Sequence, residues 1–268
     1  MRTRAAGGTG VPWRVASVMG PASRGRRARR HGNWSPPTLA SPWVPLVPLG
    51  FARTIVRSRR MLGPMDFQGT LFGAPPATAP VFDLLERQVL TRGAWVDVCR
   101  TWLPEADDVL ATLLREVPWR SERRQMYDRE VDVPRLLHTY GVGEPLPHPA
   151  LARARGALSA HYRPELGEPF VTAGCCYYRD GRDSVAWHGD TIGRGRTQDT
   201  MVAIVSLGDP RRLMLRPRLG GESISVEMGH GDLLVMGGSC QRTWEHAVPK
   251  VAHAGPRISV QFRPLDVA

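Results

Sequence analysis

The chain has 268 residues, 42% hydrophobic and 23% charged, an ordinary globular composition with enough apolar side chains for a sizeable core. No apolar run approaches the roughly 18–20 residues that a membrane-spanning helix requires, which excludes a helical membrane protein, and we expect no membrane partner. The formal net charge of +11 indicates a nucleic-acid partner only if the positive charge lies on the folded part of the chain.

Residues 1–64 differ in composition from everything that follows. They contain twelve arginines, eight prolines and no Lys, Asp or Glu, whereas the remaining 204 residues hold 24 basic and 25 acidic side chains and carry a net charge of −1. Because residues 1–64 show no helical or alternating apolar pattern, we expect a disordered Arg/Pro-rich N-terminal extension. It is a basic nucleic-acid tail, a targeting segment, or a stretch upstream of a true start at Met65, and we favour the third interpretation.

Two helices are expected before the strand-rich part of the chain. A Pro/Ala linker at 75–80 leads to a turn followed by a strand at 81–90. The first helix begins near Pro104 and packs against a sheet, because its apolar positions recur at helical spacing: Val109, Leu110, Leu113, Leu114 and Val117. The second helix covers residues 147–162.

The stretch between these helices combines arginines with aromatic side chains. Several arginines lie between Trp119 and Arg129, and Met126 and Tyr127 are interleaved with them. Arginine contacts phosphate and aromatic rings stack on bases, so the pattern predicts a lid over a nucleic-acid strand at about residues 118–140. A solvated charged loop is the alternative.

After Pro164 the pattern changes to short β-rich runs separated by Gly, Pro and Asp turns. The expected strands are 170–178, 184–188, 200–207, 212–215, 223–228, 232–236, 243–248 and 257–262. Eight strands at this spacing indicate a sandwich or jelly roll, and with helices leading the class is α+β.

His188 and Asp190, with the distant His246, form the pattern that binds a ferrous ion through one face and leaves the other face open. Any one of these histidines, taken alone, is more often a surface or core residue than a ligand. We set aside His230 because it lies in a predicted turn, and His253 because it lies in a loop.

Two arginines follow His246 in the last predicted strand. Arg257 and Arg263 are six residues apart, so in a strand both side chains project to the same face. That face can bind an acid.

Five motifs follow one another in the chain: Cys176–Asp183, His188-Gly189-Asp190, Ser206–Gly208, His246 and Arg257–Arg263. With Val133–Leu136 and Tyr140-Gly141 upstream, they resemble the AlkB family of iron(II)- and 2-oxoglutarate-dependent dioxygenases over about residues 67–265. The resemblance implies a single domain at 65–268, with a lid at about 118–140 and a double-stranded β-helix (jelly-roll) core at about 168–265. The N-terminal helices are then expected to pack on that core.

The resemblance also implies roles for individual residues. His188, Asp190 and His246 bind Fe(II) as the catalytic metal centre, and molecular oxygen is the second substrate. Arg257 pairs with the far carboxylate of 2-oxoglutarate, Tyr178 donates a hydrogen bond, and Arg263 lies close by.

Four positions bear on how far the resemblance extends. Arg135 belongs to the stretch that the family uses in its lid over the target base. Cys176, at the 2-oxoglutarate site, stands where many members carry Asn, and it cannot donate the same amide hydrogen bond. Thr191 and Ile192 stand where many members carry acidic residues that recognise the base, so base preference is left open.

The implied function is oxidative demethylation of N-alkylated nucleic-acid bases, with release of formaldehyde, on single-stranded or flipped-base DNA or on RNA. The alternatives are the same oxygenase chemistry on a protein, lipid or small metabolite, and a non-catalytic jelly-roll binding module. A cluster of arginines around the predicted mouth of the site favours nucleic acid: Arg120, Arg123, Arg124, Arg129, Arg194, Arg196, Arg211, Arg212, Arg216 and Arg218.

The four cysteines, Cys99, Cys175, Cys176 and Cys240, contain no C-x-x-C pair, so a zinc site is not expected. Free thiols and an iron(II) centre both suit a reducing cytoplasm, and we expect a cytoplasmic monomer.

Overall fold

The computed structural model describes residues 14–16, 80–126 and 129–267. The chain divides into a unit made of Met1–Met19 with Pro76–Ala268 and a second unit, Gly20–Pro75, all of which lies outside the described residues. The expected start at Met65, and the expected disordered extension apart from three residues, therefore fall outside the described part of the chain.

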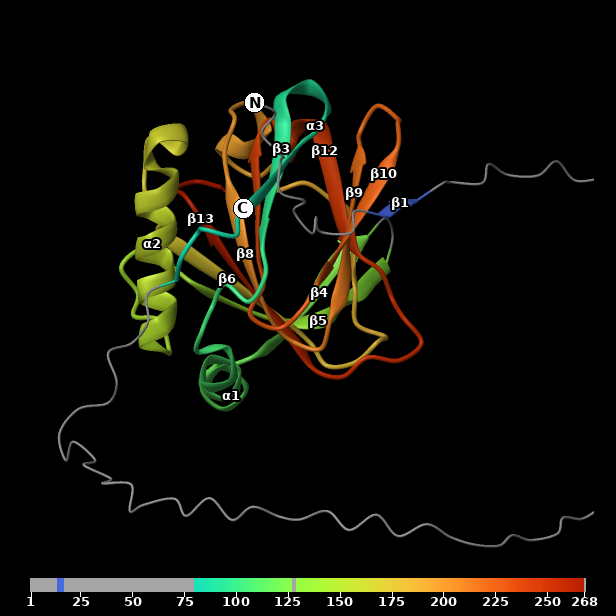
Figure 1. Ribbon diagram of the computed structural model, residues 1–268. Helices are drawn as coiled ribbons and strands as arrows, with labels where there is room; N and C mark the ends of the chain where they lie inside the picture. Colours follow the sequence, from blue (N-terminus) through green and yellow to red (C-terminus); the bar gives the residue numbers. More distant parts are fainter. Residues whose placement is uncertain (1–13, 17–79, 127–128, 268) are drawn as a thin grey trace, which may run out of the picture. The chain divides into compact units, whose positions relative to one another are not determined.

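Strands make up most of the described unit. In chain order they are β1 (Arg14–Ala16), β2 (Glu86–Val89), β3 (Ala94–Cys99), β4 (Arg120–Met126), β5 (Arg129–Tyr140), β6 (Thr172–Tyr178), β7 (Val185–His188), β8 (Val202–Gly208), β9 (Arg211–Pro217), β10 (Ser223–Met228), β11 (Leu233–Gly238), β12 (Trp244–Val248) and β13 (Arg257–Arg263). They form two sheets, one in the order β1-β10-β9-β12-β7 and one in the order β2-β3-β11-β8-β13-β6-β5-β4 (Figure 1). Every pairing in both sheets is antiparallel.

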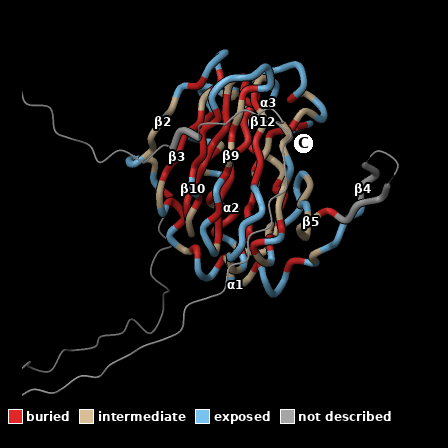
Figure 2. Tube along the Cα trace, turned by 90° about the vertical axis from the view of Figure 1, so that its right-hand side faces the viewer, coloured by how far each residue is buried: buried red, intermediate tan, exposed pale blue. Residues whose placement is uncertain are grey.

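The two faces of the eight-stranded sheet have different neighbours. On β13, Ile258, Val260 and Phe262 are fully buried in the layer shared with the helices, while the residues between them face the five-stranded sheet. The neighbouring pair Cys175 and Cys176 shows the same alternation, because each belongs to a different core layer. The strands of both sheets are mostly buried, whereas the connecting loops are exposed (Figure 2).

Two long helices cover one face of the larger sheet. Helix α1 (Ala106–Glu116) and helix α2 (Pro149–Leu166) bury apolar side chains such as Leu113 and Leu158 against it. Figure 1 shows α2 on the side of this sheet that faces away from β9 and β10. This arrangement confirms the expected α+β class, with helices packed on a core of antiparallel strands. None of the helices among the described residues is long and apolar enough to cross a membrane.

Helix α2 begins and ends where its flanking residues favour it. His148 accepts a hydrogen bond from the Ala150 amide, Pro149 occupies the first turn, and Gly167 ends the helix at φ 78°. The helix extends past the predicted end at Tyr162 and includes Pro164 in its last turn. Short helical segments complete the unit: α3 (Cys240–Thr243) and the 3₁₀ turns η1 (Thr91–Gly93) and η2 (Arg194–Arg196).

All eight strands predicted after Pro164 are present as β6 to β13, each within two residues of its expected ends. The sequence reasoning missed β3, which lies between β2 and β11. In the expected lid at about 118–140, strands β4 and β5 pair as a hairpin at the edge of the larger sheet. Within the expected disordered extension, Arg14–Ala16 pairs with β10 as the short strand β1.

Candidate metal and cosubstrate site

His188, Asp190 and His246 come together at the edge of the five-stranded sheet. Their ligand atoms all lie within 4.8 Å of one another, and His188 Nε2 is 3.7 Å from Asp190 Oδ1. Two imidazole nitrogens and one carboxylate oxygen are the donor set that suits Fe(II) with open coordination positions. Among the described residues no other group of three or more His, Cys, Asp or Glu side chains gathers in this way.

The pairing of β7 with β12 explains how the two histidines meet. His188 is the register partner of His246, and Val185 is the partner of Val248, so three residue steps on β7 match two on β12. This β-bulge turns Val185 and His188 towards the same side, although their odd separation would place them on opposite faces of a regular strand.

Three contacts orient the ligands. His188 Nδ1 lies 2.9 Å from the Ala186 carbonyl oxygen, so a proton donated there leaves Nε2 free for the metal. The amide of Asp190 donates to Gln241 Oε1 at 2.9 Å, and Arg263 Nε donates to Asp190 Oδ2 at 2.8 Å. Arg263 thus holds a metal ligand directly and also lines the cavity, where the resemblance implied only that it lies near the cosubstrate.

Burial and neighbouring charges set the protonation of the ligands. Burial alone would raise the pKa of Asp190, but Arg263 and the two imidazoles outweigh it and hold this pKa at about 2. Burial, reinforced by His188, lowers the pKa of His246 to about 3. Both groups are therefore in their metal-binding forms at neutral pH, with a charged carboxylate and a neutral imidazole.

A cavity of about 530 Å³ opens from these ligands into the space between the sheets. Arg257 and Tyr178 line its inner wall, with the Arg257 guanidinium 5.1 Å from the Tyr178 ring centre. Burial raises the pKa of Tyr178 to about 12, so its hydroxyl keeps its proton and can donate it in a hydrogen bond.

Arg257 is only 2% exposed, yet part of its guanidinium has no partner. Its Nε donates to Ser206 Oγ at 3.1 Å, but the buried Nη1 has no hydrogen bond to any residue in the described part of the chain. A buried arginine without a bonded carboxylate is costly unless an anion completes it. The position fits a carboxylate of 2-oxoglutarate between this guanidinium and the metal ligands.

The sequence reasoning missed two polar side chains of the same cavity wall. Gln261 Nε2 donates to Ser259 Oγ at 2.8 Å and lies 3.4 Å from Cys176 Sγ. Ser259 and Gln261 lie at even spacing between Arg257 and Arg263. Because alternate side chains of a strand share a face, the sequence could have predicted that all four line the same wall. The Cys176 thiol lines the cavity as expected, but its hydrogen-bonding contacts are with Gln261.

The predicted lid residues do not all lie at the cavity. Arg135 lines the cavity, and its Nη1 lies 3.3 Å from the Ser184 carbonyl oxygen. Trp119 does not line the cavity: its indole donates to the Leu113 carbonyl oxygen, and its ring lies 5.3 Å from Tyr177 on the helix-covered face of the sheet. The Trp119 ring packs against α1 and is therefore not available to the cavity. The side chain of Met126 and all of Tyr127 lie outside the described residues.

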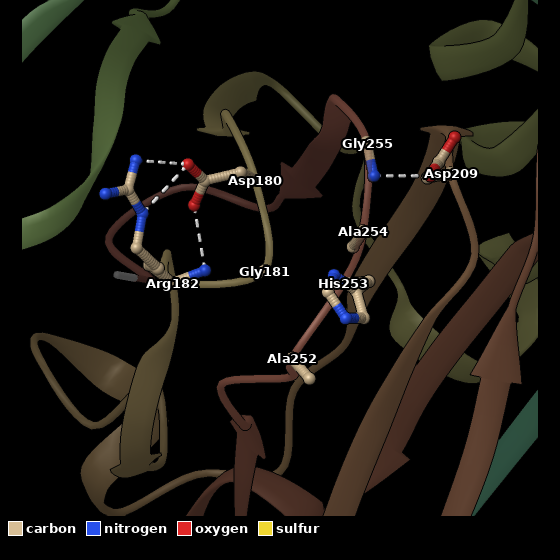
Figure 3. A pocket seen from close by; sticks show the side chains of 8 residues that line it. All are labelled: Asp180, Gly181, Arg182, Asp209, Ala252, His253, Ala254 and Gly255. Atoms are coloured by element: carbon tan, nitrogen blue, oxygen red, sulfur yellow. Dashed lines mark hydrogen bonds and ion pairs between the residues drawn. The ribbon is translucent and has the colours of Figure 1, made fainter. Parts of the chain in front are cut away.

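Three loops that connect the two sheets form a second hollow on the surface, lined by Asp180, Arg182, Asp209 and His253 (Figure 3). Its acidic groups are already paired, because Asp180 binds Arg182 and Asp209 accepts from the Gly255 amide. This hollow presents no set of three metal-binding side chains.

Comparison with known proteins agrees with this geometry. A family model described as the 2OG-Fe(II) oxygenase superfamily matches residues 98–263, which include all three ligands and Arg257. The chain is 33% identical over 187 residues to a Bos taurus protein named alpha-ketoglutarate-dependent dioxygenase alkB homolog 3; the match covers 61% of this chain and 63% of the relative. It is 34% identical over 131 residues to the Arabidopsis thaliana DNA oxidative demethylase ALKBH2, covering 40% of this chain and 41% of that one.

The chain thus spans less than two thirds of the length of these relatives. A solved structure named OsALKBH1 superposes with a TM-score of 0.47 at 15% identity, covering 67% of this chain and 100% of that one. The family match and the ligand set coincide on the same residues, and the chain belongs to the 2OG-Fe(II) oxygenase superfamily, within which its sequence is AlkB-like.

Proposed function

We propose that this chain is an Fe(II)- and 2-oxoglutarate-dependent oxygenase that demethylates N-alkylated bases of nucleic acids. One observation carries the proposal: the His-Asp-His set and the incompletely paired Arg257 open into the same cavity. A metal site alone would serve many purposes. A metal site that shares its cavity with a buried cation lacking an anionic partner is what a dicarboxylate cosubstrate needs.

The cavity residues bind and orient the reactants. Arg257 and the neutral Tyr178 hydroxyl hold one carboxylate of 2-oxoglutarate, while Arg263 keeps Asp190 charged and directed at the metal. When bound, iron with 2-oxoglutarate and oxygen supplies the oxidation of a C–H bond. One oxygen atom of O₂ enters succinate as CO₂ leaves, and the other converts N–CH₃ into N–CH₂OH, which then releases formaldehyde and leaves N–H on the base.

The names of the relatives support nucleic acid as the substrate class. One similar protein is named a DNA oxidative demethylase, and its match covers part of the same domain. Both DNA and RNA strands are candidate substrates of the proposed activity. A methyl group of a paired base reaches the metal only after the base leaves the duplex, so single-stranded substrates should react best.

The test is incubation of the full chain with Fe(II), 2-oxoglutarate and single-stranded oligonucleotides that carry 1-methyladenine or 3-methylcytosine. We expect formaldehyde and succinate in equal amounts. If succinate forms but no methylated oligonucleotide releases formaldehyde, the substrate is a protein, a lipid or a small metabolite. A protein that binds neither metal nor 2-oxoglutarate would instead be a non-catalytic jelly-roll module.

Single replacements of the ligands give a sharper form of this test. His188→Ala, Asp190→Ala and His246→Ala should each abolish turnover and weaken Mn(II) binding, because two ligands hold the ion poorly. His253→Ala is the matched control, since this histidine is exposed in a loop. Near-normal metal binding by any of the three variants would remove that residue from the ligand set.

A further inference from the structure

The outer face of the five-stranded sheet carries a group of side chains directly behind the metal ligands. Glu245 precedes His246 on β12, and its register partner Arg216 follows Leu215, the partner of His246. Because neighbours along a strand point to opposite faces, Glu245 and Arg216 face outward when His246 and Leu215 face the space between the sheets. Trp187, which precedes His188, contacts the same group.

These side chains form a stack that is open to solvent. The Arg216 guanidinium lies 4.3 Å from the Trp187 ring centre and donates twice to Glu245 Oε2, at 3.0 and 2.8 Å. Its side chain is nevertheless 43% exposed. A planar guanidinium resting on an indole presents a flat, cationic surface, which is the kind of surface on which bases stack.

Arg218 extends this group to the metal site. Among the residues that the structure describes, Arg218 has one side-chain hydrogen bond, 3.3 Å long, from Nη1 to Glu245 Oε1, and most of its N–H groups have no described partner. An ideal Cβ on Gly189 would come within 2.5 Å of Arg218 Nη2, so this guanidinium lies against the backbone between His188 and Asp190. Among the described residues, Glu245 is the one carboxylate bonded to either arginine.

This group of side chains lies next to the edge of the sheet at which the metal ligands line the cavity. Strand β7 is the outermost strand of its sheet, and its end, His188 with Gly189, lines the cavity. A polynucleotide with one base inserted towards the metal therefore has its adjoining nucleotides near this edge. Leu219, in the turn that follows Arg218, is 75% exposed, so a partner can reach this end of β9.

We propose that Trp187, Arg216 and Arg218, the β7-edge strip, bind the nucleotides that flank the target base. Arg218 contacts a phosphate, and the Arg216–Trp187 stack receives a neighbouring base. The inference rests on the proposed function and identifies where the strand is held outside the cavity. Two guanidiniums share one carboxylate here, so the strip keeps a positive charge for phosphate, whereas residues 65–268 together are nearly neutral.

The experiment measures binding of a fluorescent single-stranded oligonucleotide to the full chain loaded with Mn(II) and 2-oxoglutarate, by anisotropy at several salt concentrations. Arg218→Gln should weaken binding and make the dependence on log salt shallower by about 0.7, the value for one lost single-strand phosphate contact. Trp187→Leu should weaken binding roughly tenfold with little change in that dependence, because stacking is not electrostatic. Affinity for a methylated nucleoside, which has no flanking nucleotides, should not follow these losses.

Glu245→Gln provides a change of opposite sign. It frees both arginines from their shared carboxylate, so oligonucleotide affinity should rise, whereas a purely structural stack would only lose thermal stability. Arg212→Gln is the matched control, because Arg212 is an exposed arginine on the same strand and face, four residues from Arg216 or about 13 Å along β9. Its removal should leave the affinity unchanged.

The outcomes separate this inference from the proposed function. If wild type binds and demethylates oligonucleotides while Arg218→Gln and Trp187→Leu bind as tightly, the strip is wrong and the proposed function stands. Equal losses from Arg212→Gln and Arg218→Gln would also overturn the strip, since charge alone would explain them. If wild type releases no formaldehyde from any methylated oligonucleotide, the proposed function fails whatever the variants bind.

Discussion

At the scale of single residues, the site depends on side chains whose chemistry is completed by a partner. Asp190 stays charged in a buried position because Arg263 and two imidazoles surround it, and the pKa of this carboxyl is held at about 2. Arg257 is the opposite case, a buried cation whose Nη1 has no hydrogen-bond partner among the described residues. The Asp190 carboxylate can therefore bind a metal cation, and the Arg257 guanidinium can bind a carboxylate.

The first prediction at this scale concerns Arg257. Arg257→Lys keeps the charge but loses the planar fork, so 2-oxoglutarate should bind roughly 10- to 100-fold more weakly, as for one lost hydrogen bond to a charged group. Calorimetric titration of the Mn(II)-loaded protein measures the change, and oligonucleotide affinity should be unaffected. Arg212→Lys, at an exposed position, is the control. Unchanged 2-oxoglutarate affinity in Arg257→Lys would show that the cosubstrate binds elsewhere.

Gly189 carries the second prediction. A Cβ at this position would lie 2.5 Å from the Gln241 backbone carbonyl oxygen, and backbone cannot move aside as a side chain can. Since Gln241 also holds the Asp190 amide, Gly189→Ala should displace a ligand and lower Mn(II) affinity about tenfold or more, given that supporting contacts contribute 10- to 100-fold to metal affinity.

Gly156→Ala is the contrasting variant for that measurement. Gly156 lies in α2, and a Cβ there meets nothing within 4 Å. The alanine should leave metal affinity unchanged and stabilise the helix by about 0.5–1 kcal/mol. Equal metal affinity in both variants would mean that the close approach at Gly189 has no effect on the site.

At the scale of elements, local irregularities place the functional groups. The bulge between β7 and β12 turns His188 into the cavity, and the β4–β5 hairpin brings Arg135 to its rim. One arginine from the predicted mouth has a different role: Arg211 is 3% exposed and donates to the carbonyl oxygens of Asp180, Asp183 and Pro249. It ties the loop after β6 and the loop after β12 to β9, and it is not available for phosphate.

The attachment of α2 to the larger sheet gives the third prediction. Asp97 is fully buried and accepts from Arg87 Nε at 2.7 Å and from the Tyr162 hydroxyl at 2.8 Å. Asp97→Asn removes the charge from this network and should lower the free energy of unfolding by about 1–3 kcal/mol. Glu165→Gln is the control, because Glu165 binds the same arginine at the surface, where such a pair contributes about 0–1 kcal/mol. Urea denaturation measures the free energy of unfolding of both variants. Equal losses in Asp97→Asn and Glu165→Gln would show that the burial of Asp97 does not strengthen its contribution.

At the scale of the whole molecule, charge and fold are separated along the chain. Residues 1–64 carry all of the excess positive charge, and the described residues among them contribute one three-residue strand. The double sheet and its two helices are formed by residues 80–267. Stability and long-range electrostatics therefore depend on different parts of the sequence.

Removal of residues 1–64 is the fourth prediction. The melting temperature should change by less than about 4 °C, the effect of roughly 1 kcal/mol in a domain of this size, since the described residues of this segment contribute one three-residue pairing, β1 with β10. Nonspecific affinity for nucleic acid should fall, and its salt dependence should become shallower, because twelve arginines are removed. Differential scanning calorimetry and salt titrations test the two parts. A large drop in melting temperature would show that the extension contributes to the core.

Much of the architecture was predictable because strand alternation and turn residues are local signals. The eight strands after Pro164, the two helices and the common face of Arg257 and Arg263 all follow from residues close in sequence. The His188, Asp190 and His246 set was predictable as a pattern of residue types. Their actual meeting depends on a register between distant strands, which only the folded sheet establishes.

Tertiary structure decided the properties that depend on neighbours far apart in the chain. Trp119, an apparent lid residue, packs against α1 because apolar burial there is more favourable than exposure. Gln241 gives no sequence signal but holds Asp190, and Arg216 became part of a strip only because β9 lies beside β12. Residue types and their periodicity determine which chemistry is possible, whereas long-range packing determines which side chains carry it out.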